Sequence, residues 1–232
     1  MSGTAHATAL TFTIHADGRS FEDTLLIRTA VIAGWTGRDK AALEKHIVEL
    51  EEMGVPRPAS TPIYYRVAEA RLTTAGAMEC TGPDSSGEVE FAVVQAGGKR
   101  YLGIGSDHTD RKVETYNITV SKQMCDKPLA SELWDLDAVL PHWDQLVLRS
   151  FAVIDGVRQL YQEGSVAAML PPEAILSGYD GDLSQGSVMF CGTLAAHGGI
   201  RPAERFEFEI EDPVLGRVMR HGYDVVVLPV MG

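Results

Sequence analysis

The segment GEVEFAVV at residues 87–94 decides how this chain is expected to fold. Val89, Phe91 and Val93 occupy alternate positions, which is the period-2 pattern of a β-strand. On such a strand they can enter the core, while Glu88 and Glu90 point together to the other face, about 7 Å apart. Like charges held that close favour a bound cation, and carboxylate oxygens are the ligands that Mg²⁺, Mn²⁺ and Ca²⁺ prefer. The segment therefore predicts a strand that carries part of a divalent-metal site.

Asp107 and Lys122 extend this candidate site along the chain. Asp107 can supply a third carboxylate from a loop, and Lys122 follows as a candidate catalytic lysine beside the metal. The alternative interpretation is a half-buried strand with a solvated acidic face, because glutamates that flank an apolar residue are common on antiparallel sheets. Taken alone, the glutamate pair is compatible with both interpretations.

The composition indicates a soluble protein with a sizeable core. The chain has 232 residues, of which 45% are hydrophobic and 22% charged, and a formal net charge of -12. This acidic balance, without Lys/Arg runs interleaved with aromatics, argues against a nucleic-acid partner. Residues 1–10 lack a basic start followed by a long apolar region, and no apolar stretch approaches membrane-spanning length. We therefore predict a cytoplasmic protein with neither a nucleic-acid nor a membrane partner.

Three cysteines, Cys80, Cys125 and Cys191, are odd in number, widely spaced and outside any paired-cysteine motif. This pattern indicates neither a disulfide framework nor a zinc knuckle. We interpret the three cysteines as small buried residues.

The pattern of apolar residues predicts mostly strands with a few short helices. An N-terminal hairpin is expected, with a strand over 9–14, a turn at Asp17-Gly18 and a second strand over 25–32. Helices are predicted at 39–53, 133–139 and 171–178. Further strands are predicted at 63–67, 89–94, 99–104, 116–120, 146–154, 157–161, 188–191, 206–210 and 225–228. Because no internal repeat or linker interrupts this order, we expect one domain over residues 1–232.

Five fragments of the chain, in order, resemble the fumarylacetoacetate hydrolase family. Residues 87–94 are similar to the metal-binding strand of that family, and Asp107-His108-Thr109-Asp110-Arg111 resembles its Asp-x-Ser/Thr-x-Arg segment. The third fragment is His46-Ile47-Val48-Glu49, followed by residues 54–56 and 62–65. The others are Ser121-Lys122-Gln123 and Cys191-Gly192-Thr193-Leu194, the latter preceded by residues 182–187. The resemblance covers residues 34–228, and five fragments in the right order specify more than any one of them.

The resemblance implies an α+β, β-rich fold, namely a mixed β-sandwich or β-roll of the C-terminal-domain type with short peripheral helices. Residues 1–33 would form N-terminal strands, 36–54 a lid helix and 60–230 the metal-binding β core. It also implies a homodimer.

The implied activity is a divalent-metal-dependent hydrolase that cleaves a carbon-carbon bond in a small 1,3-dicarbonyl or oxo acid, acylpyruvate-like, through a metal-bound enolate. Glu88, Glu90 and Asp107 would hold Mg²⁺ or Mn²⁺, with Ca²⁺ as a further candidate, and Lys122 would stabilise the developing charge. The enzyme's partner is then a small-molecule oxo acid substrate.

His46 and Glu49 lie three residues apart on one face of the predicted helix, so the carboxylate can orient the imidazole as it takes a proton from water. The helix also carries Glu44, Lys45 and Glu51, so a solvated charged face is the alternative. Only the spacing shared with the family favours the catalytic interpretation.

Four residues are candidates for substrate binding. Arg111 can bind a substrate carboxylate through its planar fork, or pair with a neighbouring acid such as Asp110 or Glu114. Thr193 with Gly192 can hydrogen-bond a ligand from the end of a buried strand, although a threonine after glycine is often a turn residue. Tyr65 either lines the pocket or completes the core.

The chain departs from the family pattern at Lys112, Glu114 and Leu194, and over residues 195–199. Because of these differences, the identity of the substrate does not follow from the resemblance. Two alternative functions also stay open. The same metal site could serve a keto-acid decarboxylase, hydratase or tautomerase, or the chain could be a non-catalytic ligand-binding homologue.

Overall fold

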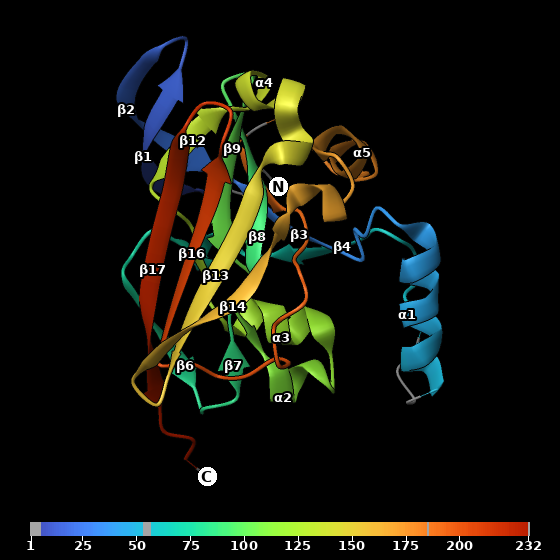
Figure 1. The fold of residues 1–232 in the computed structure, drawn as a ribbon. Helices are drawn as coiled ribbons and strands as arrows, with labels where there is room; N and C mark the ends of the chain where they lie inside the picture. Colours follow the sequence, from blue (N-terminus) through green and yellow to red (C-terminus); the bar gives the residue numbers. More distant parts are fainter. Residues whose placement is uncertain (1–5, 53–56, 185, 232) are drawn as a thin grey trace, which may run out of the picture.

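A computed structural model describes residues 6–52, 57–184 and 186–231, and two β-sheets dominate it (Figure 1). The larger sheet has eight strands in the order β2-β1-β12-β9-β8-β15-β3-β4. In chain order these strands are β1 (Thr8–Ala16), β2 (Arg19–Ile27), β3 (Thr29–Gly34), β4 (Ile63–Val67), β8 (Val89–Ala96), β9 (Lys99–Ser106), β12 (Glu132–Asp135) and β15 (Ser187–Phe190).

The second sheet has five strands in the order β14-β13-β16-β17-β6 and faces the first (Figure 1). Its strands are β6 (Ala77–Thr81), β13 (Val147–Ile154), β14 (Val157–Ser165), β16 (Arg205–Asp212) and β17 (Arg217–Leu228). Two small sheets pair β10 (Thr109–Asp110) with β7 (Ser85–Ser86), and β11 (Lys127–Pro128) with β5 (Leu72–Thr73).

Short helices lie around these sheets. They are α1 (Lys40–Glu52), α2 (Arg111–Glu114), α3 (Ile118–Met124), α4 (Leu136–Val139) and α5 (Pro172–Ser177), with 3-10 turns η1 (Glu69–Arg71), η2 (Leu140–Gln145) and η3 (Val166–Ala168). Figure 1 shows α1 at the margin of the molecule, beyond β4 and apart from the two sheets. Among the described residues, no helix is long and apolar enough to cross a membrane.

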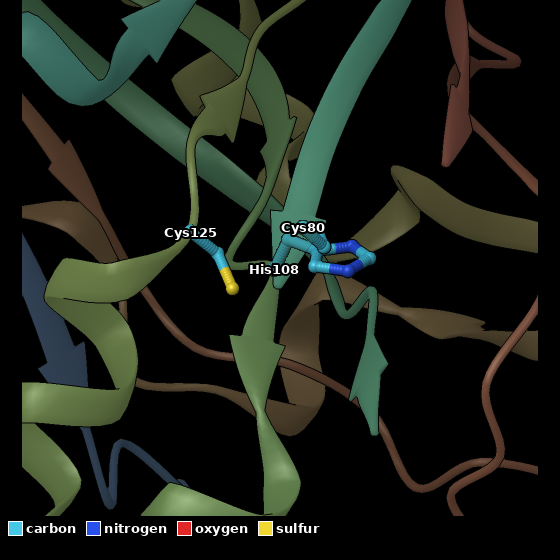
Figure 2. Close-up of side chains that lie close together, drawn as sticks. All are labelled: Cys80, His108 and Cys125. Carbon is cyan, nitrogen blue, oxygen red and sulfur yellow. The ribbon is translucent and has the colours of Figure 1, made fainter. Parts of the chain in front are cut away.

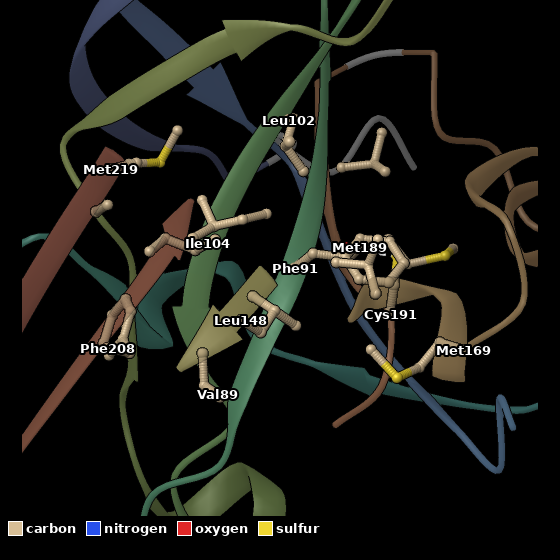
Figure 3. Packing of buried hydrophobic residues seen from close by; sticks show 14 of the residues in the cluster. Val89, Phe91, Leu102, Ile104, Leu148, Met169, Met189, Cys191, Phe208 and Met219 are labelled. Atoms are coloured by element: carbon tan, nitrogen blue, oxygen red, sulfur yellow. Dashed lines mark hydrogen bonds between the residues drawn. The ribbon is translucent and has the colours of Figure 1, made fainter. Parts of the chain in front are cut away.

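The alternation in β8 places apolar side chains between the two sheets. Val89, Phe91 and Val93 pack in one buried cluster with Leu148 of β13 and Phe208 of β16 (Figure 3). The burial of apolar surface is the main stabilising contribution to such a layered fold.

The other face of β8 is also buried, because the large sheet curls around a second cluster. Ala92 and Val94 of β8 share this cluster with Phe12 and Ile14 of β1, although β1 and β8 are not paired. Glu90 points to the same face and is 3% exposed. The alternative interpretation, a solvated acidic face, is therefore wrong for Glu90.

The N-terminal hairpin and its turn are confirmed, but its second strand is β2 (Arg19–Ile27), and the predicted strand 25–32 is divided between β2 and β3. β1 pairs antiparallel with β2, and the register Ala16↔Arg19 leaves Asp17 and Gly18 as a two-residue turn. Both turn residues have positive φ, 53° and 69°, as tight hairpin turns of this length require. Most other predicted strands are also confirmed within a few residues, and β4 matches its prediction at both ends.

Two further sequence predictions are wrong. Residues 116–120 do not form a strand, since α3 begins at Ile118, where the Asn117 side chain accepts a hydrogen bond from the Val120 amide at 3.0 Å. That cap overrides the β-propensity of the local sequence. Residues 133–139 are not all helix, because they begin in β12, and α4 follows only at Leu136, after the cap Asp135. The strand β6 was not predicted at all.

The β-rich fold class with short peripheral helices is confirmed by these two facing sheets. The division of residues 1–232 into N-terminal strands, lid helix and β core stays a prediction.

Candidate metal centre

Three carboxylates converge where β8 begins and β9 ends. One oxygen each from Glu88, Glu90 and Asp107 can be chosen so that all lie within 4.8 Å of one another. The antiparallel pairing of β8 with β9 produces this arrangement, and the Asp107 amide continues it by donating to the Glu88 carbonyl at 3.0 Å. The structure thus brings together the three residues that the sequence proposes as ligands.

Of the three carboxylates, Glu90 is the one whose negative charge is least balanced by nearby positive charge. Its Oε2 accepts a hydrogen bond from the Gly192 amide at 2.7 Å. Burial, followed by the negative charge of Asp107, raises the pKa of Glu90 well above its ordinary value. The site therefore favours a positive charge beside this carboxylate.

Asp107 is paired with two lysines. Lys122 Nζ on α3 donates to Asp107 Oδ2, and Lys127 Nζ on β11 lies 3.2 Å from Oδ1. Burial opposes ionisation, but the two ammonium groups lower the pKa of Asp107 to about 2. Burial would also lower the pKa of Lys122, yet Asp107 and Glu88 raise it above its ordinary value. Lys122 is therefore a fixed positive charge at this site.

Arg111 pairs with Glu88, the most exposed of the three carboxylates. Its guanidinium lies 3.0 Å from Glu88 Oε1 and donates to Glu114 Oε2 at 2.9 Å, while Nε donates to Ser86 Oγ at 2.7 Å. Of the two neighbouring acids considered for Arg111, the structure selects Glu114, since Asp110 instead caps α2 by accepting from the Val113 amide.

The remaining predicted substrate-binding residues lie around the centre in different ways. The Tyr65 ring is 5.7 Å from Lys122 Nζ. Thr193 Oγ1 donates to the Val89 carbonyl at 2.7 Å and accepts from Gln162 Nε2 at 2.8 Å, so this hydroxyl is used within the protein. Gly192 contributes the amide that holds Glu90.

His46 and Glu49 both belong to α1, as the sequence predicts. Their side chains lie outside the described part of the structure, so their catalytic roles stay predictions.

One known protein family matches most of the chain. Residues 33–223 match the family described as "Protein of unknown function (DUF2848)". The chain belongs to the DUF2848 family. A comparison of this DUF2848 protein with curated proteins finds no match.

Solved structures share the fold of this DUF2848 protein. A putative fumarylacetoacetate isomerase/hydrolase from Oleispira antarctica has 18% identity and a TM-score of 0.61, covering 94% of this chain and 99% of that chain. A 5-carboxymethyl-2-hydroxymuconate delta-isomerase from Mycobacterium smegmatis has 15% identity and a TM-score of 0.63, covering 91% and 84%. A 2-keto-3-deoxy-D-arabinonate dehydratase has 14% identity and a TM-score of 0.61, covering 92% and 86%. The predicted resemblance is confirmed at the level of the fold.

Two residues of the DUF2848 site were missed by the sequence reasoning. Lys127 is fully buried against Asp107, and Gln162 is 1% exposed and bonds both Val89 and Thr193. Neither belongs to a motif, and lysine and glutamine are mostly surface residues. Only their burial against Asp107 and β8 reveals their part in the site.

Proposed function

We propose that this DUF2848 protein is a divalent-metal-dependent enzyme that acts on a small oxo acid, with Glu88, Glu90 and Asp107 as the metal ligands. The observation that carries the proposal is the convergence of three carboxylates, two of them almost fully buried. Carboxylates buried together are costly unless positive charge compensates them. Solved proteins of the same fold that are described as an isomerase and a dehydratase support an enzymatic role.

The donor set fits a hard cation. Three carboxylates offer oxygen alone, which suits Mg²⁺ or Mn²⁺, with Ca²⁺ as a further candidate. Asp107 forms ion pairs with two lysines, and Glu88 forms one with Arg111. Within the described residues Glu90 forms no ion pair and accepts a hydrogen bond from the Gly192 amide. When bound, the cation supplies a Lewis acid that polarises a substrate carbonyl.

The chain's own side chains supply the rest of the chemistry in this proposal. Lys122, buried and charged, stabilises the negative charge that develops when a carbon fragment departs as an enolate. Arg111 holds Glu88 in place and borders the site where a substrate carboxylate would enter. Tyr65, beside Lys122, forms part of the wall for a small substrate.

The leading reaction is hydrolysis of a carbon-carbon bond in an acylpyruvate-like 1,3-dicarbonyl compound. This reaction needs a base that takes a proton from water, and we assign that role to His46, oriented by Glu49. Decarboxylation, hydration or tautomerisation of a keto acid is the second candidate. Decarboxylation and tautomerisation can proceed at the same carboxylates without activated water. Solved proteins of the same fold that are described as an isomerase and as a dehydratase support this second candidate.

The first test is the melting temperature of purified protein stripped with a chelator, measured with magnesium, manganese or calcium. A ligand that binds only the folded state raises the melting temperature. We expect a rise in the wild type that is absent in Glu88→Gln/Glu90→Gln. A matched control is Glu22→Gln/Asp23→Asn, which removes two exposed carboxylates from β2 and is expected to keep the rise.

The absence of a rise with all three ions at millimolar concentration would contradict the metal-dependent proposal and favour a non-catalytic binding protein. If the rise is present, turnover of acylpyruvates and oxaloacetate with the same ion separates the two reactions. We expect His46→Ala to abolish hydrolysis while sparing decarboxylation or enolisation. Loss of every reaction in His46→Ala, with the metal-dependent rise intact, would contradict the assignment of His46 to water activation alone.

A further inference from the structure

A second cluster of metal-ligating side chains lies next to the carboxylate centre, because His108 directly follows Asp107 in the chain. It consists of Cys80 on β6, His108 directly after Asp107, and Cys125 at the C-terminal cap of α3 (Figure 2). One ligand atom from each residue lies within 4.8 Å of the other two. The three residues are 3%, 1% and 3% exposed, and both cysteines are free thiols.

The hydrogen bonding of His108 leaves one ring nitrogen for a ligand. Its Nδ1 lies 2.8 Å from the Tyr223 hydroxyl, which in turn lies 2.9 Å from Ser106 Oγ. Its Nε2 is buried and has no hydrogen-bond partner within the described residues. A buried polar atom without a partner is costly, whereas metal-ligating histidines typically bond through one nitrogen and are held by a hydrogen bond at the other. The observed pattern is that of a histidine prepared to bind a metal.

We propose that Cys80, His108 and Cys125 form a second metal site, which binds a thiophilic divalent cation, zinc in particular. Two thiolates and an imidazole are the donors that zinc prefers, and a zinc-sulfur bond of about 2.3 Å places two sulfur ligands about 3.8 Å apart in a tetrahedral site. The spacing in the cluster accommodates that arrangement. Each thiol releases its proton when the metal binds. The all-oxygen carboxylate centre, by contrast, suits harder ions.

The cation has a positioning role, because its ligands lie on the segments that build the carboxylate centre. His108 follows Asp107 in the chain, and Cys125 ends the helix that carries Lys122. Zinc at the cluster would therefore tie both segments to β6 of the other sheet. The three ligands are almost fully buried, and they leave the fourth position of a tetrahedral zinc ion to a water molecule or another donor.

The test uses full-length, chelator-stripped protein titrated with Co²⁺, whose thiolate complexes absorb by sulfur-to-cobalt charge transfer. We expect this absorption to saturate at one equivalent in the wild type and to be lost in Cys80→Ser and in Cys125→Ser. It should be retained in Cys191→Ser, the matched control for a third buried thiol outside the cluster. It should also be retained in Glu88→Gln/Glu90→Gln, so the outcome does not depend on the carboxylate centre.

X-ray absorption of the zinc-loaded wild type provides a measurement that does not depend on the folding of variants. We expect two sulfur neighbours and at least one nitrogen. A zinc shell without sulfur, or a Co²⁺ spectrum without charge transfer in the folded wild type, would overturn the proposal. A disulfide between Cys80 and Cys125, found by peptide mapping of freshly purified protein alkylated without reductant, would also overturn it.

Discussion

Gly192 holds the buried carboxylate of Glu90 through its backbone amide and has a conformation that other residues rarely adopt. Its φ is +103°, and an added Cβ would lie 1.8 Å from Thr36 Oγ1. The Thr36 hydroxyl is fixed by its own hydrogen bond to the Cys191 carbonyl. At this position the absence of a side chain is therefore required by both the backbone angle and the packing.

Gly192→Ala is expected to lower the free energy of unfolding by about 3 kcal/mol, since strain and overpacking add at one site. The control is Gly216→Ala in the turn after β16. Gly216 has φ +63° and no atom within 4 Å of the added Cβ, so the strain alone should cost about 1 kcal/mol. Urea denaturation measures both values. Equal losses in the two variants would show that the contact with Thr36 is unimportant.

Gln162 connects elements that are distant in the sequence. Its Oε1 accepts from the Val89 amide at 2.9 Å and from Ser150 Oγ at 2.8 Å, and its Nε2 donates to Thr193 Oγ1 and to the Leu194 carbonyl. β14 of the five-stranded sheet is thereby joined to β8 of the other sheet and to the segment after β15. A single buried amide thus holds the start of the metal-binding strand.

Gln162→Leu is expected to destabilise the protein by about 3 kcal/mol, because it leaves several buried polar groups without partners. Gln159→Leu, at a half-buried glutamine of the same strand, should change stability by less than about 1 kcal/mol. Thermal and urea denaturation compare the two variants. A Gln162→Leu protein as stable as Gln159→Leu would contradict this role.

Asp212 ties the end of β16 to two other segments. The carboxylate accepts from the Val214 and Leu215 amides at 3.1 and 3.0 Å, from Arg217 Nε at 3.2 Å, and lies 2.9 Å from His142 Nε2. Burial opposes ionisation, but the Leu215 amide, then His142 and Arg217, hold the pKa of Asp212 below its ordinary value.

Because the pKa of Asp212 is lower in the folded state, ionised Asp212 stabilises the fold above the unfolded value of 3.8, and this stabilisation is lost as the pH falls through the folded pKa. Asp212→Asn should therefore cost about 2 kcal/mol at pH 7. The difference from the wild type should shrink below pH 3.8. Urea denaturation across pH measures it, and a difference that grows on acidification would contradict the assignment.

At the scale of the whole molecule, the C-terminal part of β17 presents an apolar surface. Val226, Val227 and Leu228 are 44%, 52% and 37% exposed, and Val230 and Met231 beyond the strand are more exposed still. Exposed apolar side chains concentrated in one short segment are typical of an interaction site. We propose that it belongs to the interface of the homodimer expected from the family resemblance.

Light scattering coupled to size exclusion should then give about twice the chain mass of 25.2 kDa. Val227→Glu should shift the protein toward the monomer, because it places a charge in the apolar interface. The matched control is Val214→Glu in the turn after β16, a valine that is 50% exposed and should leave the dimer intact. A wild type that elutes as a monomer at all concentrations would contradict the dimer.

The sequence alone determined the features that depend on local chemistry. Period-2 alternation predicted β8, the Asp17-Gly18 pair predicted the first hairpin, and the order of short motifs predicted the fold and the three carboxylates. Each depends on residues close together in the chain, where side-chain direction and turn geometry are fixed by the backbone.

Only the tertiary structure decided the features that depend on contacts between distant segments. The curl of the large sheet buried Glu90. Packing between distant segments brought Lys122 of α3 against Asp107 and buried Lys127, and the approach of β6 to α3 brought Cys80 beside His108 and Cys125. Local propensity cannot specify these outcomes, because the free energy of burial and pairing comes from residues tens of positions away in the sequence.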